Sequence, residues 1–120
     1  MKNNLNYVKM VNRRYRKGYR FEHRVKKYLE RFGYKVFRLA GSKPIDLIAI
    51  KVGGEAIYYI ECKSTNYVKR AGKKLLRVTS GLPGRAIVAY RDIRNRIRFY
   101  DPVMEREVSI PPSKELDKYQ

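Results

Sequence analysis

Two acidic residues interrupt apolar, β-branched stretches of this sequence. Asp46 lies within residues 45–50, and Glu61 lies within residues 58–62. A carboxylate on a buried strand is costly unless its charge is compensated, and a bound cation is the obvious compensation. The chain has one His and one Cys, which excludes a zinc site of the Cys/His type. Carboxylates would instead hold a hard ion such as Mg²⁺, for which Mn²⁺ can substitute.

The same two segments predict that the carboxylates meet. A glycine pair at positions 53 and 54 is typical of a hairpin turn that folds two strands side by side. Side chains alternate along a strand, so Glu61 and Lys63 project from one face while Cys62 points to the other. We expect Asp46 and Glu61 to share a divalent ion, which lowers the pKa of a bound water. Lys63 is placed to orient that water or to stabilise the phosphate under attack.

A helix is predicted before these strands. Its apolar side chains recur at helical spacing and Gly33 ends it; they are Phe21, Val25, Tyr28, Leu29 and Phe32. Glu22, near the helix start, could add a third carboxylate, for a second ion or an outer-shell water. A glutamate in a first helical turn is also commonly there because it suits the helix dipole.

The remaining pattern predicts an α/β fold. Strands are expected over 34–39, 45–52, 56–62, 86–90 and 97–100, and a second helix is expected over 67–80. The order helix, three strands, helix, two strands indicates a mixed central β-sheet flanked by helices. We divide the chain into a basic N-terminal arm at 1–12, one catalytic domain at 13–105 and a C-terminal tail at 106–120.

The charge of the chain indicates a polyanionic partner. Its 29 Lys and Arg against 11 Asp and Glu give a net charge of +18. Nucleic acid is the first candidate, and an anionic membrane is a weaker one because no long basic helix has an apolar face. No apolar run approaches the roughly 20 residues that span a bilayer. The lone cysteine gives no hint of an oxidising compartment, so we expect a cytoplasmic protein and no membrane association.

A resemblance rests on these residues and their neighbours. Asp46, fourteen intervening residues and Glu61-Cys62-Lys63 resemble the D…(D/E)xK signature of the restriction-endonuclease-like nuclease fold. More narrowly, the sequence looks like the archaeal Holliday-junction resolvases, which include versions carried by archaeal viruses; a viral chain would act in the host cytoplasm. The segments that carry this likeness are Arg16-Lys17-Gly18, Glu22, Gly33-Tyr34, Val36-Phe37-Arg38, Ala40-Gly41-Ser42, Ile45-Asp46-Leu47-Ile48-Ala49 and Ile60-Glu61-Cys62-Lys63-Ser64.

The resemblance implies a role for each matching residue. The three carboxylates would lie at the metal, Lys63 would be the catalytic lysine, and Ser42 would lie in a loop that contacts DNA. The implied catalytic residues are thus Glu22, Ser42, Asp46, Glu61 and Lys63. Members of the family are homodimers that cut two opposed strands of a four-way DNA junction with Mg²⁺, and the two-fold axis of a dimer suits a two-fold junction.

Basic side chains near these motifs are expected to bind DNA phosphates. Arg38 holds a position that is basic in the family, and it could touch the scissile strand. Exposed lysines on the second helix are also ordinary in any soluble protein. The predicted DNA-binding residues are Arg13, Arg14, Arg16, Lys17, Arg20, Arg38, Lys43, Lys69, Arg70, Lys73 and Lys74.

The sequence therefore predicts a metal-dependent endonuclease that resolves four-way DNA junctions in recombination, repair or replication. Two alternatives stay open. One is a nuclease of the same fold that acts on other substrates, such as nicked, flapped or linear DNA, or RNA. The other is a non-catalytic nucleic-acid-binding module.

Overall fold

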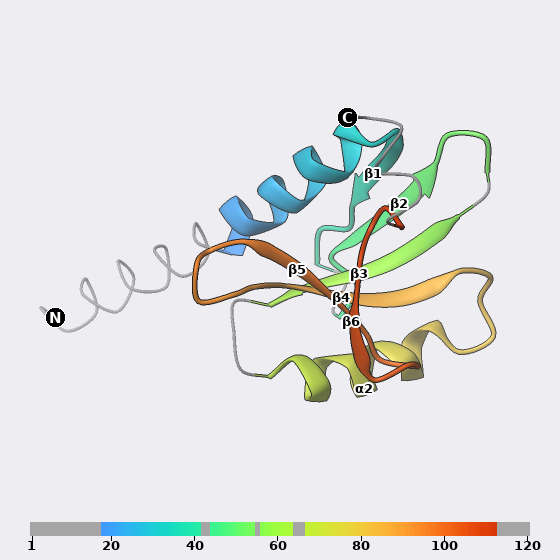
Figure 1. Ribbon diagram of the computed structural model, residues 1–120. Helices are drawn as coiled ribbons and strands as arrows, with labels where there is room; N and C mark the ends of the chain where they lie inside the picture. Colours follow the sequence, from blue (N-terminus) through green and yellow to red (C-terminus); the bar gives the residue numbers. More distant parts are fainter. Residues whose placement is uncertain (1–17, 42–43, 55, 64–66, 113–120) are drawn as a thin grey trace, which may run out of the picture.

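A six-stranded sheet with strand order β1-β2-β3-β4-β5-β6 forms the centre of the computed structural model (Figure 1). The structure describes residues 18–41, 44–54, 56–63 and 67–112. The N-terminal helix is described over 18–31. The other elements are β1 (Tyr34–Arg38), β2 (Leu47–Lys51), β3 (Ile57–Lys63), α2 (Val68–Thr79), β4 (Arg85–Arg91), β5 (Ile97–Asp101) and β6 (Arg106–Val108).

The sheet is mixed, as the sequence predicted. β3 and β4 pair in parallel, and the other neighbouring strands pair antiparallel. The parallel pair arises because α2 carries the chain from the end of β3 back to the start of β4, which is the crossover that parallel strands require. The ends of β3 and β4 therefore lie at the same edge of the sheet.

Each helix covers one face of the sheet. The N-terminal helix buries Val25 and Leu29 in a core that includes Ile60. On the other face, α2 buries Leu75 in a core with Val88. Because side chains alternate along β3, Glu61 and Lys63 lie on the α2 face, while Ile60 faces the N-terminal helix. None of the described helices has the length and apolar character needed to cross a bilayer.

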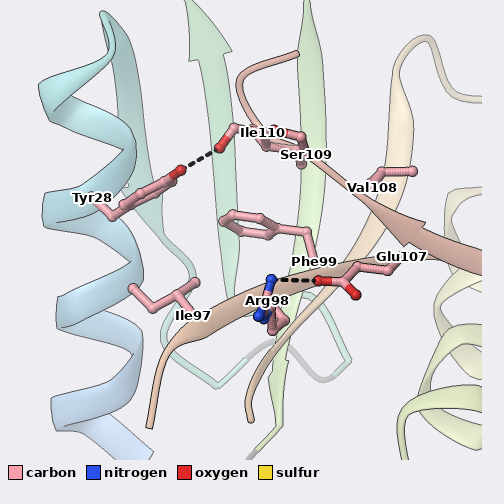
Figure 2. Close-up of a pocket in the computed structure, with 8 residues that line it drawn as sticks. All are labelled: Tyr28, Ile97, Arg98, Phe99, Glu107, Val108, Ser109 and Ile110. Atoms are coloured by element: carbon pink, nitrogen blue, oxygen red, sulfur yellow. Dashed lines mark hydrogen bonds and ion pairs between the residues drawn. The ribbon is translucent and has the colours of Figure 1, made fainter. Parts of the chain in front are cut away.

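The C-terminal segment corrects one expectation. Residues 106–112 were assigned to a tail, but Arg106–Val108 form β6 and Ile110 is buried in the core beneath the N-terminal helix. The Tyr28 hydroxyl donates a hydrogen bond of 2.8 Å to the Ile110 carbonyl (Figure 2). A three-residue strand is too short for alternation to show in the sequence, so only the packing reveals it. The expected arm at 1–12 and the residues after 112 lie outside the described part.

Asp101, at the end of β5, gives the fold an acid-sensitive contact. Its carboxylate accepts hydrogen bonds from the Arg85 guanidinium and from the backbone N–H groups of Val103 and Met104. Burial raises the pKa of Asp101, but these hydrogen bonds lower it by more, so the pKa lies below its ordinary value. Such a carboxylate stabilises the fold above its unfolded-state pKa of about 3.9. That stabilisation is lost as the pH falls through the folded-state pKa.

Asp101→Asn is expected to lower the free energy of unfolding by about 1–3 kcal/mol at pH 7, since a charged hydrogen-bond acceptor is removed from a buried site. The difference from the parent chain should shrink as the pH falls below about 4. Urea unfolding at pH 7 and pH 3 measures it. Glu30→Gln, at an exposed position of the N-terminal helix, is the control. A difference that stays constant with pH would contradict the assignment.

Candidate active site

Asp46 directly precedes β2, and Glu61 lies near the end of the neighbouring strand β3. The Asp46 N–H donates to the Ile60 carbonyl at 2.9 Å, and the next residue, Leu47, pairs with Ile60 in the β2–β3 register. The strand predicted over 45–52 is shorter in the structure, where β2 spans Leu47–Lys51. The hydrogen bond from Asp46 still joins this segment to β3 just before β2 begins. Asp46 and Glu61 are both only 4% exposed. The two residues thus lie on neighbouring segments of the predicted hairpin, and the divalent ion shared by their carboxylates stays a prediction.

The Asp46 carboxylate is held against β3. Its Oδ2 accepts a hydrogen bond of 2.8 Å from the backbone N–H of Cys62, the residue that follows Glu61. A hydrogen bond to a carboxylate stabilises its ionised form and fixes its orientation. The Asp46 carboxylate is therefore held at the backbone of β3, at the residue that follows Glu61.

Lys63 shares the strand face of Glu61, as the alternation predicted. Its Nζ lies 3.3 Å from Glu61 Oε1. The Lys63 side chain is 45% exposed, whereas that of Glu61 is 6% exposed. The Glu61 carboxylate therefore lies at the buried end of this ion pair, and the Lys63 ammonium group lies at its solvent-facing end.

A pocket of about 330 Å³ joins this end of β3 to α2. From α2 and the residue before it, Tyr67, Arg70 and Lys74 line the pocket together with Glu61 and Lys63. Residues three or four apart lie on one side of a helix, which explains why these three share it. The Glu61 carboxylate lies at the bottom of the pocket, and one guanidinium and two ammonium groups surround it. This arrangement suits a phosphate that is bound next to a cation.

Two of the four basic residues predicted on the second helix to bind DNA line this pocket. Arg70 and Lys74 line it, whereas Lys69 and Lys73 are exposed elsewhere on α2. Tyr67, which is 67% exposed at the rim, is a pocket residue that was not predicted from the sequence. The signal was available in principle, because an aromatic residue three positions before Arg70 lies on the side of the helix that carries Arg70 and Lys74.

Glu22 has a different environment. Its Oε2 accepts a hydrogen bond of 2.9 Å from Nε of Arg38, and the two form an ion pair. The Arg38 guanidinium also lies 5.0 Å from the centre of the Tyr19 ring. Among the residues that the structure describes, no group of three His, Cys, Asp or Glu side chains is arranged to hold a metal ion. The role at the metal that the resemblance implies for Glu22 stays a prediction, and the contact that the structure shows for its carboxylate is the ion pair with Arg38.

The position of the N-terminal helix explains the contact between Glu22 and Arg38. The helix covers the sheet face opposite α2, so its residues approach Arg38 at the end of β1 and not the α2 face. Arg20 is exposed on the same helix. The other predicted site residues lie outside the described part of the chain: Arg13, Arg14, Arg16, Lys17, Ser42 and Lys43.

Comparisons with known proteins find archaeal Holliday junction resolvases. A crossover junction endodeoxyribonuclease Hjc from Methanocaldococcus jannaschii is 44% identical over 59 residues, which span 49% of this chain and 43% of that relative. The matched segment is thus less than half the length of the relative. The 1.6 Å structure of Archaeoglobus fulgidus Hjc, a Holliday junction resolvase from an archaeal hyperthermophile, has a similar fold, with a TM-score of 0.60 and 26% identity over 76% of this chain and 80% of that one.

The family described as archaeal Holliday junction resolvase (Hjc) matches residues 13–111, which include every strand of the sheet and the Asp46, Glu61 and Lys63 motif. The α/β nuclease-like fold predicted from the sequence is confirmed by the structural match. The chain belongs to the archaeal Holliday junction resolvase family.

Proposed function

We propose that this chain is a homodimeric, Mg²⁺-dependent endonuclease that resolves four-way DNA junctions. The observation that carries the proposal is the buried Glu61 carboxylate beside Lys63 in a basic-rimmed pocket, with the buried Asp46 carboxylate held on the Cys62 N–H next to it in the chain. Family membership and a net charge of +18 support a branched-DNA substrate. A binding module without catalysis would have no need of two facing buried carboxylates.

The carboxylates of Asp46 and Glu61 would hold the metal. They offer only oxygen donors, which is the ligand chemistry that Mg²⁺ prefers. When bound, Mg²⁺ supplies Lewis acidity and makes a neighbouring water more acidic. The charge of the ion would also compensate the burial of two facing carboxylates.

The remaining pocket residues would position the phosphate and the nucleophile. Lys63 Nζ, 3.3 Å from Glu61 Oε1, would donate a hydrogen bond to the attacking water or to a phosphate oxygen. Arg70 and Lys74 would bind oxygens of the same phosphate or the next one along the strand. In the reaction, a bond forms between the water oxygen and phosphorus, and the bond from phosphorus to the 3′ oxygen breaks.

The uncovered part of the α2 sheet face supports a dimer. α2 packs on β3, β4 and β5, and its core leaves β1 and β2 aside. On β1, Phe37 pairs across the strands with Ile48 and is 54% exposed. Exposed apolar residues on an uncovered sheet face are typical of an interface. A dimer of this chain would place two active sites about one two-fold axis, as two opposed cuts require.

The test is cleavage of a synthetic immobile four-way junction, compared with a linear duplex of the same arm sequence. We expect two symmetric incisions on opposed strands in Mg²⁺, and none in EDTA. Light scattering should give the mass of two chains. Equal cleavage of junction and linear duplex would support a nuclease of other substrate preference, and binding without cleavage would support the non-catalytic alternative.

The lining of the pocket predicts that two pairs of basic residues on α2 contribute unequally to junction cleavage. The double variant Arg70→Ala, Lys74→Ala should lower kcat/KM for junction cleavage about 10²-fold, the scale on which one donor to a reacting oxyanion acts. The matched control, Lys69→Ala with Lys73→Ala, removes the same charge from residues outside the pocket and should change kcat/KM far less. Equal losses in the two variants, measured at one ionic strength, would mean that only overall charge matters.

A further inference from the structure

The hairpin that joins β4 to β5 is strongly basic, and the mechanism above does not use it. Residues 91–98 contain four arginines and one aspartate, a net charge of +3. β4 runs parallel to β3 with Tyr90 opposite Lys63, so the hairpin leaves the sheet at the edge where the active site lies. At a rise of about 3.3 Å per residue, its tip reaches roughly 10–15 Å beyond Lys63. That distance is within the width of a DNA duplex.

Asp92 fixes the shape of this hairpin. Its Oδ1 accepts hydrogen bonds of 2.9 Å from the backbone N–H groups of Arg94 and Arg96. Its Oδ2 accepts from Nε of Arg96 at 3.1 Å and from Nε of Arg98 at 2.9 Å. The backbone hydrogen bond from Arg96, followed by those from the guanidinium groups, lowers the pKa of Asp92 to about 2. The carboxylate therefore stays ionised at physiological pH, and the turn stays closed.

The hairpin is also docked on the N-terminal helix. Arg24 donates from Nη1 to the Asn95 side-chain oxygen at 3.1 Å and from Nη2 to the Asn95 carbonyl at 2.8 Å. Figure 1 shows this loop beside the first described turns of the helix, on the side of the sheet where β3 ends. Arg98 is held from β6 as well, by an ion pair of 3.2 Å with Glu107 (Figure 2). The tip is therefore held by two other elements.

Ile93 and Arg94 are left facing solvent at this ordered tip. Ile93 is 103% exposed, so it takes no part in packing. The Arg94 side chain is exposed and forms no ion pair with any carboxylate in the described part of the chain. Arg96 and Arg98, by contrast, both form ion pairs with Asp92. A fully exposed isoleucine beside an unneutralised guanidinium suits a polyanion that also offers apolar surface.

We propose that this hairpin tip is a second DNA contact that recognises the branch: Arg94 binds a backbone phosphate and Ile93 packs against bases exposed where the arms meet. The inference rests on the proposed junction substrate and adds a recognition element outside the active-site pocket. Apolar side chains that enter DNA between base steps are a known means of reading distorted DNA. A tip that is rigid before binding loses little conformational entropy on contact.

The experiment measures binding to an immobile four-way junction and to a linear duplex of the same arms, in EDTA so that no cleavage occurs. Arg94→Ala should weaken binding to both DNAs and reduce the slope of log affinity against log salt by about 0.9, the value for one phosphate contact. Ile93→Ser should keep the salt slope and lower the ratio of junction to linear affinity. Arg106→Ala is the control, because Arg106 is exposed at the opposite end of the sheet.

Asp92→Ala separates shape from charge. The variant raises the net charge of the hairpin from +3 to +4 while removing the hydrogen bonds that order it. We expect weaker junction binding despite the added positive charge. Tighter binding would show that charge alone acts here, and it would overturn the proposed contact.

Three further results would overturn the tip contact. The first is wild-type affinity, salt slope and junction preference in both tip variants. The second is a tip variant that no longer shows the mass of a dimer, while the remaining dimers bind the junction with unchanged affinity. The tip would then be an interface between protein chains. The third is a melting temperature so reduced that the losses follow unfolding.

Mg²⁺-dependent junction cleavage by the parent chain is measured separately. The tip contact can therefore fail while the proposed function stands. If the parent chain neither binds nor cuts junctions, both fail.

Discussion

Replacing Glu61 with glutamine is expected to abolish Mg²⁺-dependent cleavage of a four-way junction while junction binding stays intact or becomes tighter. Glutamine keeps the shape of the side chain but removes the negative charge that would hold the ion. It also removes repulsion between the site and the DNA phosphate. Asp46→Asn should act in the same way, since asparagine retains an oxygen that can accept the Cys62 N–H.

Single-turnover cleavage measures this effect, and an equilibrium binding assay in EDTA measures affinity. Glu30→Gln, which removes one negative charge from an exposed position of the N-terminal helix, should cut at the parent rate. Melting curves should show that Glu61→Gln is at least as stable as the parent without metal, because a buried charge is replaced by a neutral group. Cleavage that persists in both carboxylate variants would remove the metal-dependent mechanism.

Lys63→Met is expected to lower the single-turnover cleavage rate by about 10²–10³-fold, the scale of one lost donor to a reacting oxyanion. Methionine has a similar length without the ammonium group. Because the Lys63 side chain is 45% exposed at the pocket rim, the fold should not depend on it. Junction affinity should fall by no more than the loss of one phosphate contact implies.

The matched control is Lys69→Met on α2, where the same charge is lost outside the pocket. The two variants are compared at saturating protein, so that the rate reports chemistry and not binding. A Lys63→Met rate within a few-fold of the Lys69→Met rate would exclude Lys63 from the reaction. A loss that disappears at saturating protein would place Lys63 in DNA binding alone.

The sequence determined the central strands of this protein and the chemistry placed on them. Two adjacent strands are specified by an apolar run that Asp46 interrupts, a glycine pair, and a second apolar run that Glu61 interrupts. Alternation and turn chemistry act within a few residues, so this information is local. The same alternation set Glu61 and Lys63 on one strand face. These relations are local in the chain or lie across one hairpin, and the structure has them as predicted.

Only the tertiary structure decided which distant residues meet this pair. Glu22 pairs with Arg38 of β1, because the N-terminal helix packs on the sheet face opposite α2, and its role near the metal stays a prediction. Helical spacing showed that Arg70 and Lys74 share a side, but not that this side faces Glu61.

The strand at 106–108 and the docked hairpin at 91–98 were decided in the same way. Each depends on a partner far along the chain: Ile110 on Tyr28, and Asn95 on Arg24. Local periodicity fixes the direction in which a side chain leaves its own element. The packing of apolar faces over the whole sheet fixes which element it then meets, and no short stretch of sequence contains that information.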